Sequence, residues 1–209
     1  MFSSTLTPSV HRAKFGSPFF MIEIHSTSIP EVKVMTSSRA IDGRGFFAET
    51  YSRRDFIEIG ITADFVQDNE SWNSAAGTIR GLHFQRPDFA QAKLVRVLSG
   101  AILDVAVDIR VGSPTYAQHV ALELDAADNK QIFIPRGFAH GFCTLAPATH
   151  VTYKVDAYYS EAHESGLLWN DPNLAIKWPV DSAAAILSEK DADLPGFAAF
   201  ESPFMFEAA

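Results

Sequence analysis

The chain has one cysteine, Cys143, and no long hydrophobic run. One cysteine excludes a disulfide within the chain, and the apolar run 141–145 around it favours a buried structural thiol. The nearby His140 keeps a catalytic thiol open as an alternative. No stretch approaches the ~20 apolar residues that a membrane-spanning helix needs, and the apolar patch at 19–22 is too short and too late for a signal peptide. We therefore expect a cytoplasmic protein that makes no membrane contact.

Basic residues are too few to suggest nucleic-acid binding. The 209 residues include 17 Lys and Arg against 25 Asp and Glu, a net charge of -8, so no basic face could easily dominate. A small anionic substrate held by a few local arginines and lysines is compatible with this balance. Hydrophobic residues make up 47% of the chain, enough for one sizeable core. We expect a single domain at 21–209 after a poorly ordered extension at 1–20, which is rich in Ser, Thr and Pro.

Short strand-like runs separated by turn residues fill the chain from Met21 onward. Residues 104–109 alternate between a valine and isoleucine face and a face with Asp104, Ala106 and Asp108. The same period of two recurs at 120–124 and 151–155. Helical patterns are limited to Arg53–Ile59 and a short piece near Ala183–Leu187, and no repeat or glycine-rich phosphate loop is present. The pattern predicts an all-β sandwich or barrel with a few short helices.

Polar side chains that are unusual inside a β-sheet gather in a few segments. These segments are Arg80–Gln85, Lys93, Pro135–Gly141, Gly43–Glu49, Phe65–Asn69, Tyr153-Lys154 and Ser188–Asp191. Taken singly, each has an ordinary structural interpretation. A strand histidine such as His83 is more often hydrogen-bonded than catalytic, and Tyr153 suits a core position with its hydroxyl satisfied. On these residues alone, both interpretations stay open.

A metal site is the first alternative to consider. Pro135-x-Gly137-x-x-His140 resembles the second motif of the cupins, a jelly-roll superfamily whose metal-binding members add His-x-His and a glutamate. Here the first motif reads His83-Phe84-Gln85, with Lys93 downstream. Two histidines, an amide and a lysine make a poor divalent-metal site, because an ammonium group repels the cation. We expect a cupin-like jelly roll that binds no metal, with a metal-dependent cupin oxygenase as the rival enzyme.

Several longer motifs follow one another between about Met21 and Asp191. They are Arg80-Gly81-Leu82-His83-Phe84-Gln85, Lys93-Leu94-Val95-Arg96, Asp104-Val105-Ala106-Val107-Asp108-Ile109-Arg110, Ile134-Pro135-x-Gly137-Phe138-Ala139-His140-Gly141-Phe142, Tyr153-Lys154, Tyr158-Tyr159-Ser160 and Leu168-Trp169-Asn170-Asp171-Pro172. In this order they resemble the dTDP-4-dehydrorhamnose 3,5-epimerases, a cupin-like family. Members of that family act on dTDP-4-dehydro-6-deoxy-glucose, whose 4-ketone acidifies the hydrogens on carbons 3 and 5.

The resemblance implies a role for each matched residue. His83 would be the base and Asp191 its orienting partner, Lys93 would stabilise the enolate oxygen, and Tyr153 would deliver the new proton. Eight further residues would bind the substrate: Arg44, Glu49, Gln67, Asn69, Arg80, His140, Glu164 and Lys190. The guanidinium groups suit the diphosphate. The chemistry needs no cofactor, and the sequence contains no nicotinamide fingerprint.

Three questions stay open at this level. The resemblance implies a homodimer, in which an exchanged strand is common. It also admits relatives that invert one carbon only. A non-catalytic barrel that binds sugar nucleotides is a further alternative. Finally, strict alternation puts His83 and Arg80 on opposite faces of one strand, although both are expected to contact the substrate. Either a bulge at Gly81 re-aims one of them, or they serve different parts of an extended ligand.

Overall fold

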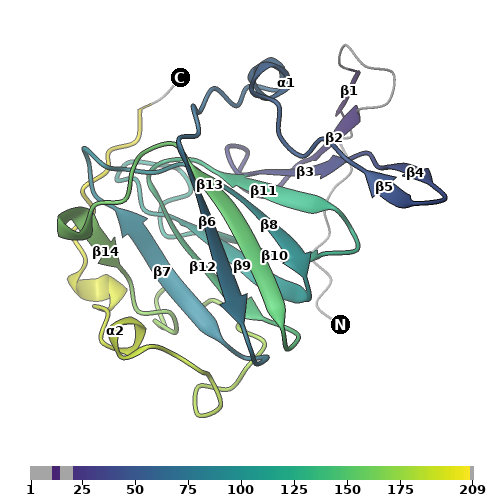
Figure 1. Ribbon diagram of the computed structural model, residues 1–209. Helices are drawn as coiled ribbons and strands as arrows, with labels where there is room; N and C mark the ends of the chain where they lie inside the picture. The colour runs from purple at the N-terminus through teal and green to yellow at the C-terminus, as the bar shows by residue number, and fades with distance from the viewer. Residues whose placement is uncertain (1–10, 15–20, 208–209) are drawn as a thin grey trace.

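Two antiparallel sheets lie face to face in the computed structural model, which describes residues 11–14 and 21–207 (Figure 1). The larger sheet contains, in spatial order, β1 (His11–Lys14), β2 (Met21–His25), β3 (Lys33–Ser37), β11 (Lys130–Ile134), β8 (Lys93–Ser99), β13 (Thr149–Val155) and β6 (Gln67–Asn73). The smaller sheet contains β10 (His119–Asp125), β9 (Ala101–Asp108), β12 (Phe138–Thr144), β7 (Ile79–Gln85) and β14 (Glu164–Gly166). The all-β fold class predicted from the sequence is confirmed.

The remaining elements are short. The strands β4 (Ala40–Asp42) and β5 (Gly45–Phe47) form a separate hairpin that projects from the sandwich (Figure 1). The helices are α1 (Arg53–Glu58) and α2 (Glu189–Ala192), with single 3-10 turns at Glu161–His163 and Phe197–Ala199. Within the described residues, no helix is long and apolar enough to cross a membrane.

The main core fills the space between the two sheets. Its members come from both sheets, for example Val95 and Val151 from the larger and Ala106 and Phe142 from the smaller. Because side chains alternate along a strand, residues two positions before or after these core residues also point inward. A second apolar cluster packs on the outer face of the smaller sheet, where the C-terminal segment around Phe200 covers it. The strand β9 is therefore buried on both faces.

Most local expectations agree with the structure. The helix expected at Arg53–Ile59 is α1, and the alternating segments are β9, β10 and β13. The helix expected near Ala183–Leu187 is wrong, because a turn and a parallel bridge from Ile186 to Thr78 occupy this stretch. In the extension expected at 1–20, residues 11–14 form β1, and the other residues lie outside the described part of the chain.

Candidate active site

A bulge in β7 brings two of the predicted site residues onto one face. His140 of β12 pairs with His83 of β7, but Phe142 pairs with Arg80, so β7 holds one extra residue in this stretch. Gly81 has φ +125°, and a Cβ there would lie 2.5 Å from the Cα of Gly141. Only glycine, which has no Cβ, can lie this close to the backbone of Gly141. The extra residue turns Arg80 and His83 toward one cavity, so the bulge at Gly81 is the alternative that the structure contains, of the two that the sequence left open.

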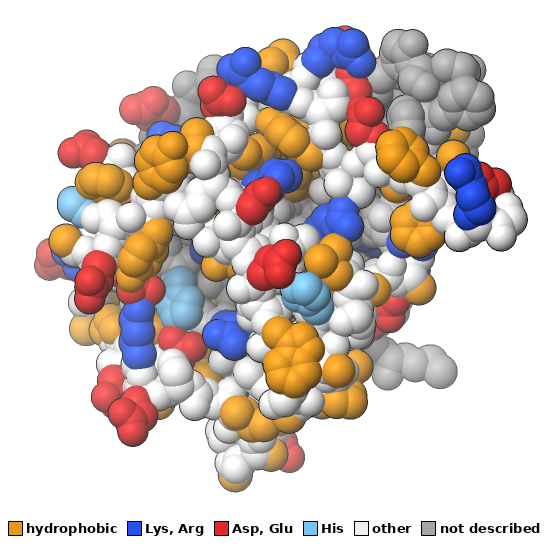
Figure 2. Space-filling view, in the orientation of Figure 1, with side chains coloured by type: hydrophobic (Ala, Val, Ile, Leu, Met, Phe, Trp, Pro, Cys, Tyr) orange, Lys and Arg blue, Asp and Glu red, His pale blue; other side chains and the backbone are white. Residues whose placement is uncertain are grey.

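Two hollows that share His83, Lys93 and Tyr153 lie between the sheets. The inner hollow, of about 280 Å³, is lined by Glu70, Ser71, Arg80, His83, Lys93, His140, Phe142, Tyr153, Ser188, Lys190 and Asp191. The rim hollow, of about 250 Å³, is lined by Gln67, Asn69, His83, Phe84, Gln85, Gln91, Lys93, Tyr153, Tyr159 and Glu164. Histidine and Lys or Arg side chains gather in this region between β7 and β6 (Figure 2). All the predicted site residues except Arg44 and Glu49 line one of the hollows.

His83 and Asp191 form a hydrogen-bonded pair. The Nε2 of His83 lies 2.6 Å from Oδ1 of Asp191. Asp191 sits in α2, where the Ser188 hydroxyl caps the helix by accepting from the Asp191 amide at 3.1 Å. Burial alone would raise the pKa of Asp191, but hydrogen bonds, chiefly from His83, lower it overall. The ionised carboxylate therefore accepts the Nε2 proton, which leaves Nδ1 of His83 as the basic nitrogen.

Lys93 is a buried cation beside this pair. It is the first residue of β8 and points inward like Val95 two residues on. Its Nζ donates to the backbone carbonyl of His83 at 3.5 Å. Burial lowers the pKa of Lys93 to about 8, against the opposing pull of Asp104 and Glu164. The ammonium form predominates at pH 7, in a site where a charge acts at low dielectric.

A second histidine is backed by a second aspartate. His140 lies directly opposite His83 in the β12–β7 ladder. Its Nε2 is 2.9 Å from Oδ2 of Asp104, a fully buried residue of β9. Burial lowers the pKa of His140, although Asp104 acts in the opposite direction, so the ring is neutral at pH 7. The sequence analysis listed Asp104 only as part of a strand motif.

Tyr153 approaches the cavity from the larger sheet. It belongs to β13 and packs against the main core, while His83 comes from the smaller sheet. Burial raises the pKa of Tyr153, so the phenol keeps its proton at neutral pH. The imidazole of His83 and the phenol of Tyr153 therefore line the same two hollows from opposite sheets.

Polar side chains line the rim hollow in linked groups. The Nε2 of Gln67 donates to Oδ1 of Asn69 at 2.8 Å. Glu164 forms an ion pair with Lys190 of α2 and accepts a 2.8 Å hydrogen bond from the Tyr159 hydroxyl. Sequence reasoning did not include Tyr159 among the site residues, although its Tyr-Tyr-Ser segment was one of the matched motifs. These groups place several donors and acceptors beside the catalytic candidates.

Arg44 and Glu49 lie away from both hollows of their own chain. Arg44 sits at the turn of the β4–β5 hairpin, with its side chain 90% exposed and paired to Asp42. Glu49 lies near Arg54 at the start of α1. The described residues thus bring ten of the predicted side chains together and leave these two apart.

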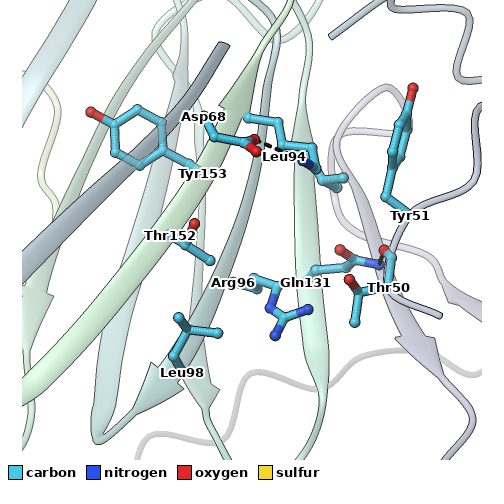
Figure 3. A pocket seen from close by; sticks show the side chains of 10 residues that line it. Thr50, Tyr51, Asp68, Leu94, Arg96, Leu98, Gln131, Thr152 and Tyr153 are labelled. Carbon is cyan, nitrogen blue, oxygen red and sulfur yellow. Dashed lines mark hydrogen bonds and ion pairs between the residues drawn. The ribbon is translucent and has the colours of Figure 1, made fainter. Parts of the chain in front are cut away.

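A third hollow, of about 200 Å³, opens on the outer face of the larger sheet (Figure 3). Arg96, Gln131 and Thr152 point into it, whereas the Tyr153 ring points away from them. Its lining includes no predicted catalytic residue other than Tyr153.

The described residues 11–14 and 21–207 contain no group of three or more His, Cys, Asp or Glu side chains that could hold a metal ion. Cys143 is buried, and burial raises its pKa to about 11, which agrees with a structural thiol.

Comparison with known proteins gives a consistent result. The family model described as dTDP-4-dehydrorhamnose 3,5-epimerase matches residues 26–199. A dTDP-4-dehydrorhamnose 3,5-epimerase of Sinorhizobium fredii is 46% identical over 192 residues, which cover 92% of this chain and 97% of that protein. The crystal structure of the Bacillus anthracis epimerase with TDP and PPi bound has a TM-score of 0.81 and 50% identity, over 84% of this chain and 99% of the other. A Legionella pneumophila epimerase in complex with dTDP-4-keto-L-rhamnose has a TM-score of 0.85 and 40% identity, over 90% and 100% of the two chains. This chain belongs to the dTDP-4-dehydrorhamnose 3,5-epimerase family.

Proposed function

We propose that this protein inverts carbons 3 and 5 of dTDP-4-dehydro-6-deoxy-glucose to give dTDP-4-dehydro-L-rhamnose, by proton abstraction and reprotonation through an enolate. The observation that supports this most directly is the placement of three groups around one cavity. The His83–Asp191 pair enters from the smaller sheet, Tyr153 enters from the larger sheet, and the buried Lys93 lies beside them.

His83 is the proposed base. With its Nε2 proton held by Asp191 at 2.6 Å, Nδ1 carries the lone pair that takes the proton from carbon 3 or carbon 5. Asp191 then stabilises the imidazolium that forms. General base catalysis of this kind contributes about 10²–10⁴-fold to a rate. The proton leaves His83 to solvent before the next abstraction.

Lys93 is proposed to stabilise the enolate. As the carbon–hydrogen bond breaks, its electron pair moves into the ring and negative charge develops on the ketone oxygen at carbon 4. A buried ammonium directed at that oxygen lowers the barrier, because the charge is already in place before the reaction. Removing one such donor in well-studied enzymes costs about 3–4 kcal/mol.

Tyr153 is the proposed proton donor. Inversion requires that the new proton arrive on the face opposite the base, and Tyr153 belongs to the opposite sheet. Its raised pKa keeps the phenol protonated until the enolate accepts the proton. The phenolate is then reprotonated from solvent.

The remaining lining residues suit the nucleotide and the sugar. Arg80 and Lys190 line the inner hollow and offer cationic groups for the diphosphate. Gln67, Asn69 and Glu164 in the rim hollow supply donors and acceptors for the nucleoside. The site thus favours an anionic sugar nucleotide, in agreement with the ligands named for the related structures.

We further infer a homodimer in which the hairpin of one copy reaches the nucleotide end of the other. The hairpin projects from the sandwich (Figure 1). Ile41 and Phe46 on it are 79% and 61% exposed. Arg44 at its tip lines neither hollow of its own chain. Light scattering should give twice the 23.0 kDa of one chain, and a monomer at micromolar concentration would refute the dimer.

The function is tested by incubating purified protein with dTDP-4-dehydro-6-deoxy-glucose and determining the configuration of the product by NMR. Inversion at both carbons supports the proposal. Inversion at carbon 3 alone would identify a single-carbon epimerase, and tight nucleotide binding without conversion would identify a binding protein. We expect the enzyme in the cytoplasm, where fractionation of the source cells should recover it.

A further inference from the structure

Asp104 is a buried acid for which the proposed mechanism has so far given no role. It lies on the inward face of β9, between the inward residues Ile102 and Ala106 of the main core. The residue is 0% exposed, and its Oδ1 has no hydrogen-bond partner among the described residues. A carboxylate in such a place is unfavourable unless neighbouring groups compensate for its charge. Its only hydrogen-bond partner within the described chain is His140.

The His140–Asp104 contact parallels the His83–Asp191 pair. The two histidines are opposite each other in the β12–β7 ladder, and each uses Nε2 to contact an aspartate. His140 lines the inner hollow, and its Nδ1 has no hydrogen bond to any described residue. If the Nε2 proton is held by Asp104, then Nδ1 carries a lone pair. The nitrogen that remains available is then an acceptor, suited to a hydroxyl of the sugar.

Asp104 also balances charge in the site. Lys93 and Asp104 are not in direct ion-pair contact, but Asp104 is the strongest of the groups that favour the charged form of Lys93. The titratable groups around Lys93 are Asp104 from β9, Glu164 from β14, His83 from β7, His140 from β12 and Tyr153 from β13. Of these, Asp104 and Glu164 are the two whose electrostatic interaction favours the ammonium form of Lys93. Asp104 is the fully buried one, so solvent screens it least.

We propose that Asp104 is a positioning residue: it fixes the Nε2-protonated tautomer of His140, so that Nδ1 accepts from a substrate hydroxyl. This role rests on the proposed epimerase function. Asp104 itself touches neither the inner nor the rim hollow. It acts through His140, which it contacts directly.

The test compares Asp104→Asn with the wild-type protein in two ways. Without substrate, ¹⁵N NMR of the imidazole rings should show His140 as the Nε2-protonated tautomer in the wild type and a changed tautomer population in the variant. With substrate, kcat should fall about 10- to 100-fold, as when the outer partner of a metal-bound histidine is lost. KM should change little, since the nucleotide contacts are intact. The alkaline limb of the kcat/KM profile should move to lower pH, because Lys93 loses its charge more easily.

Asp108→Asn is the matched control. Asp108 lies on the same strand and is equally buried, but it pairs with Arg110 and the Ser113 and Thr115 hydroxyls. Its loss should lower the melting temperature without moving the alkaline limb or the His140 tautomer. An Asp104→Asn variant that behaves like this control would overturn the proposal.

The two hypotheses can fail separately. If the wild-type protein converts no substrate, the epimerase function is wrong, whereas the tautomer of His140 is still measured without substrate. If the wild-type protein is active but His140 is protonated on Nδ1, only the role of Asp104 is wrong. If Asp104→Asn does not fold, the tautomer of His140 in the wild-type protein still tests the proposed role of Asp104.

Discussion

Lys93→Met should make the protein more stable while removing its activity. Lys93 is 9% exposed, and burial lowers its pKa from 10.5 to about 8. Since one pKa unit corresponds to about 1.4 kcal/mol, holding the ammonium in the folded protein at pH 7 costs roughly 3 kcal/mol. Methionine removes the charge and retains most of the length. Losing the long hydrogen bond to the His83 carbonyl offsets about 1 kcal/mol of this gain. The free energy of unfolding should therefore rise by about 2 kcal/mol.

The pH dependence of this gain has a definite sign. Between pH 8 and 10.5 the unfolded wild-type chain binds more protons at this lysine than the folded chain, so wild-type stability gains from Lys93 as the pH rises through that window. The advantage of Lys93→Met should therefore shrink from pH 7 to pH 9. In the same range, kcat/KM of the wild type should fall about tenfold per pH unit above about 8, because the free enzyme loses its ammonium.

The assay is equilibrium unfolding in guanidinium chloride at pH 7 and pH 9, at one fixed protein concentration. Lys130→Met is a suitable control, because Lys130 forms an exposed ion pair with Asp128 at 2.7 Å that is worth little in water. It should leave the stability within about 1 kcal/mol and show no such pH dependence. A Lys93→Met protein that is less stable than the wild type, or whose advantage is the same at both pH values, would refute the reasoning.

Three further substitutions test other parts of the site. Asp191→Asn should lower kcat/KM about 10²–10⁴-fold in steady-state assays, because an amide cannot stabilise the His83 imidazolium; a loss below tenfold would count against the pair. Tyr153→Phe should still exchange substrate hydrogens but yield little inverted product, most visibly at carbon 5 by NMR; normal inversion would exclude Tyr153 as the donor. Gly81→Ala should lower the free energy of unfolding by more than about 2 kcal/mol, since its Cβ would lie 2.5 Å from the Gly141 Cα; an unchanged melting curve would contradict the bulge.

Much of the fold follows from local rules that the sequence displays directly. Alternation predicted β9, β10 and β13, and turn residues predicted their ends, because a strand repeats every two residues regardless of its neighbours. The same rule, with the glycine at position 81, suggested the bulge in β7. Near Ala183–Leu187 the local pattern indicated a short helix, but a bridge from Ile186 to Thr78 formed instead. Tertiary pairing overrode helix propensity there.

The site was predictable only in part. The family resemblance identified the ten residues that line the two hollows, but alternation alone did not show that β9 would be covered on both faces. Asp104 was therefore not recognised as a buried acid beside His140, although it was one of two aspartates on a strand face shared with Ala106. Arg44 illustrates a different limit, because its proposed role depends on a second copy of the chain.

Proton NMR of dTDP-4-dehydro-6-deoxy-glucose in deuterated water, with the wild-type protein and with His83→Ala, tests the central claim most directly. The account predicts deuterium at carbons 3 and 5 of inverted product with the wild type, and no exchange at either carbon with His83→Ala. Near-normal exchange in His83→Ala would contradict the assignment of the base, and no deuterium with the wild type would contradict the proposed function itself.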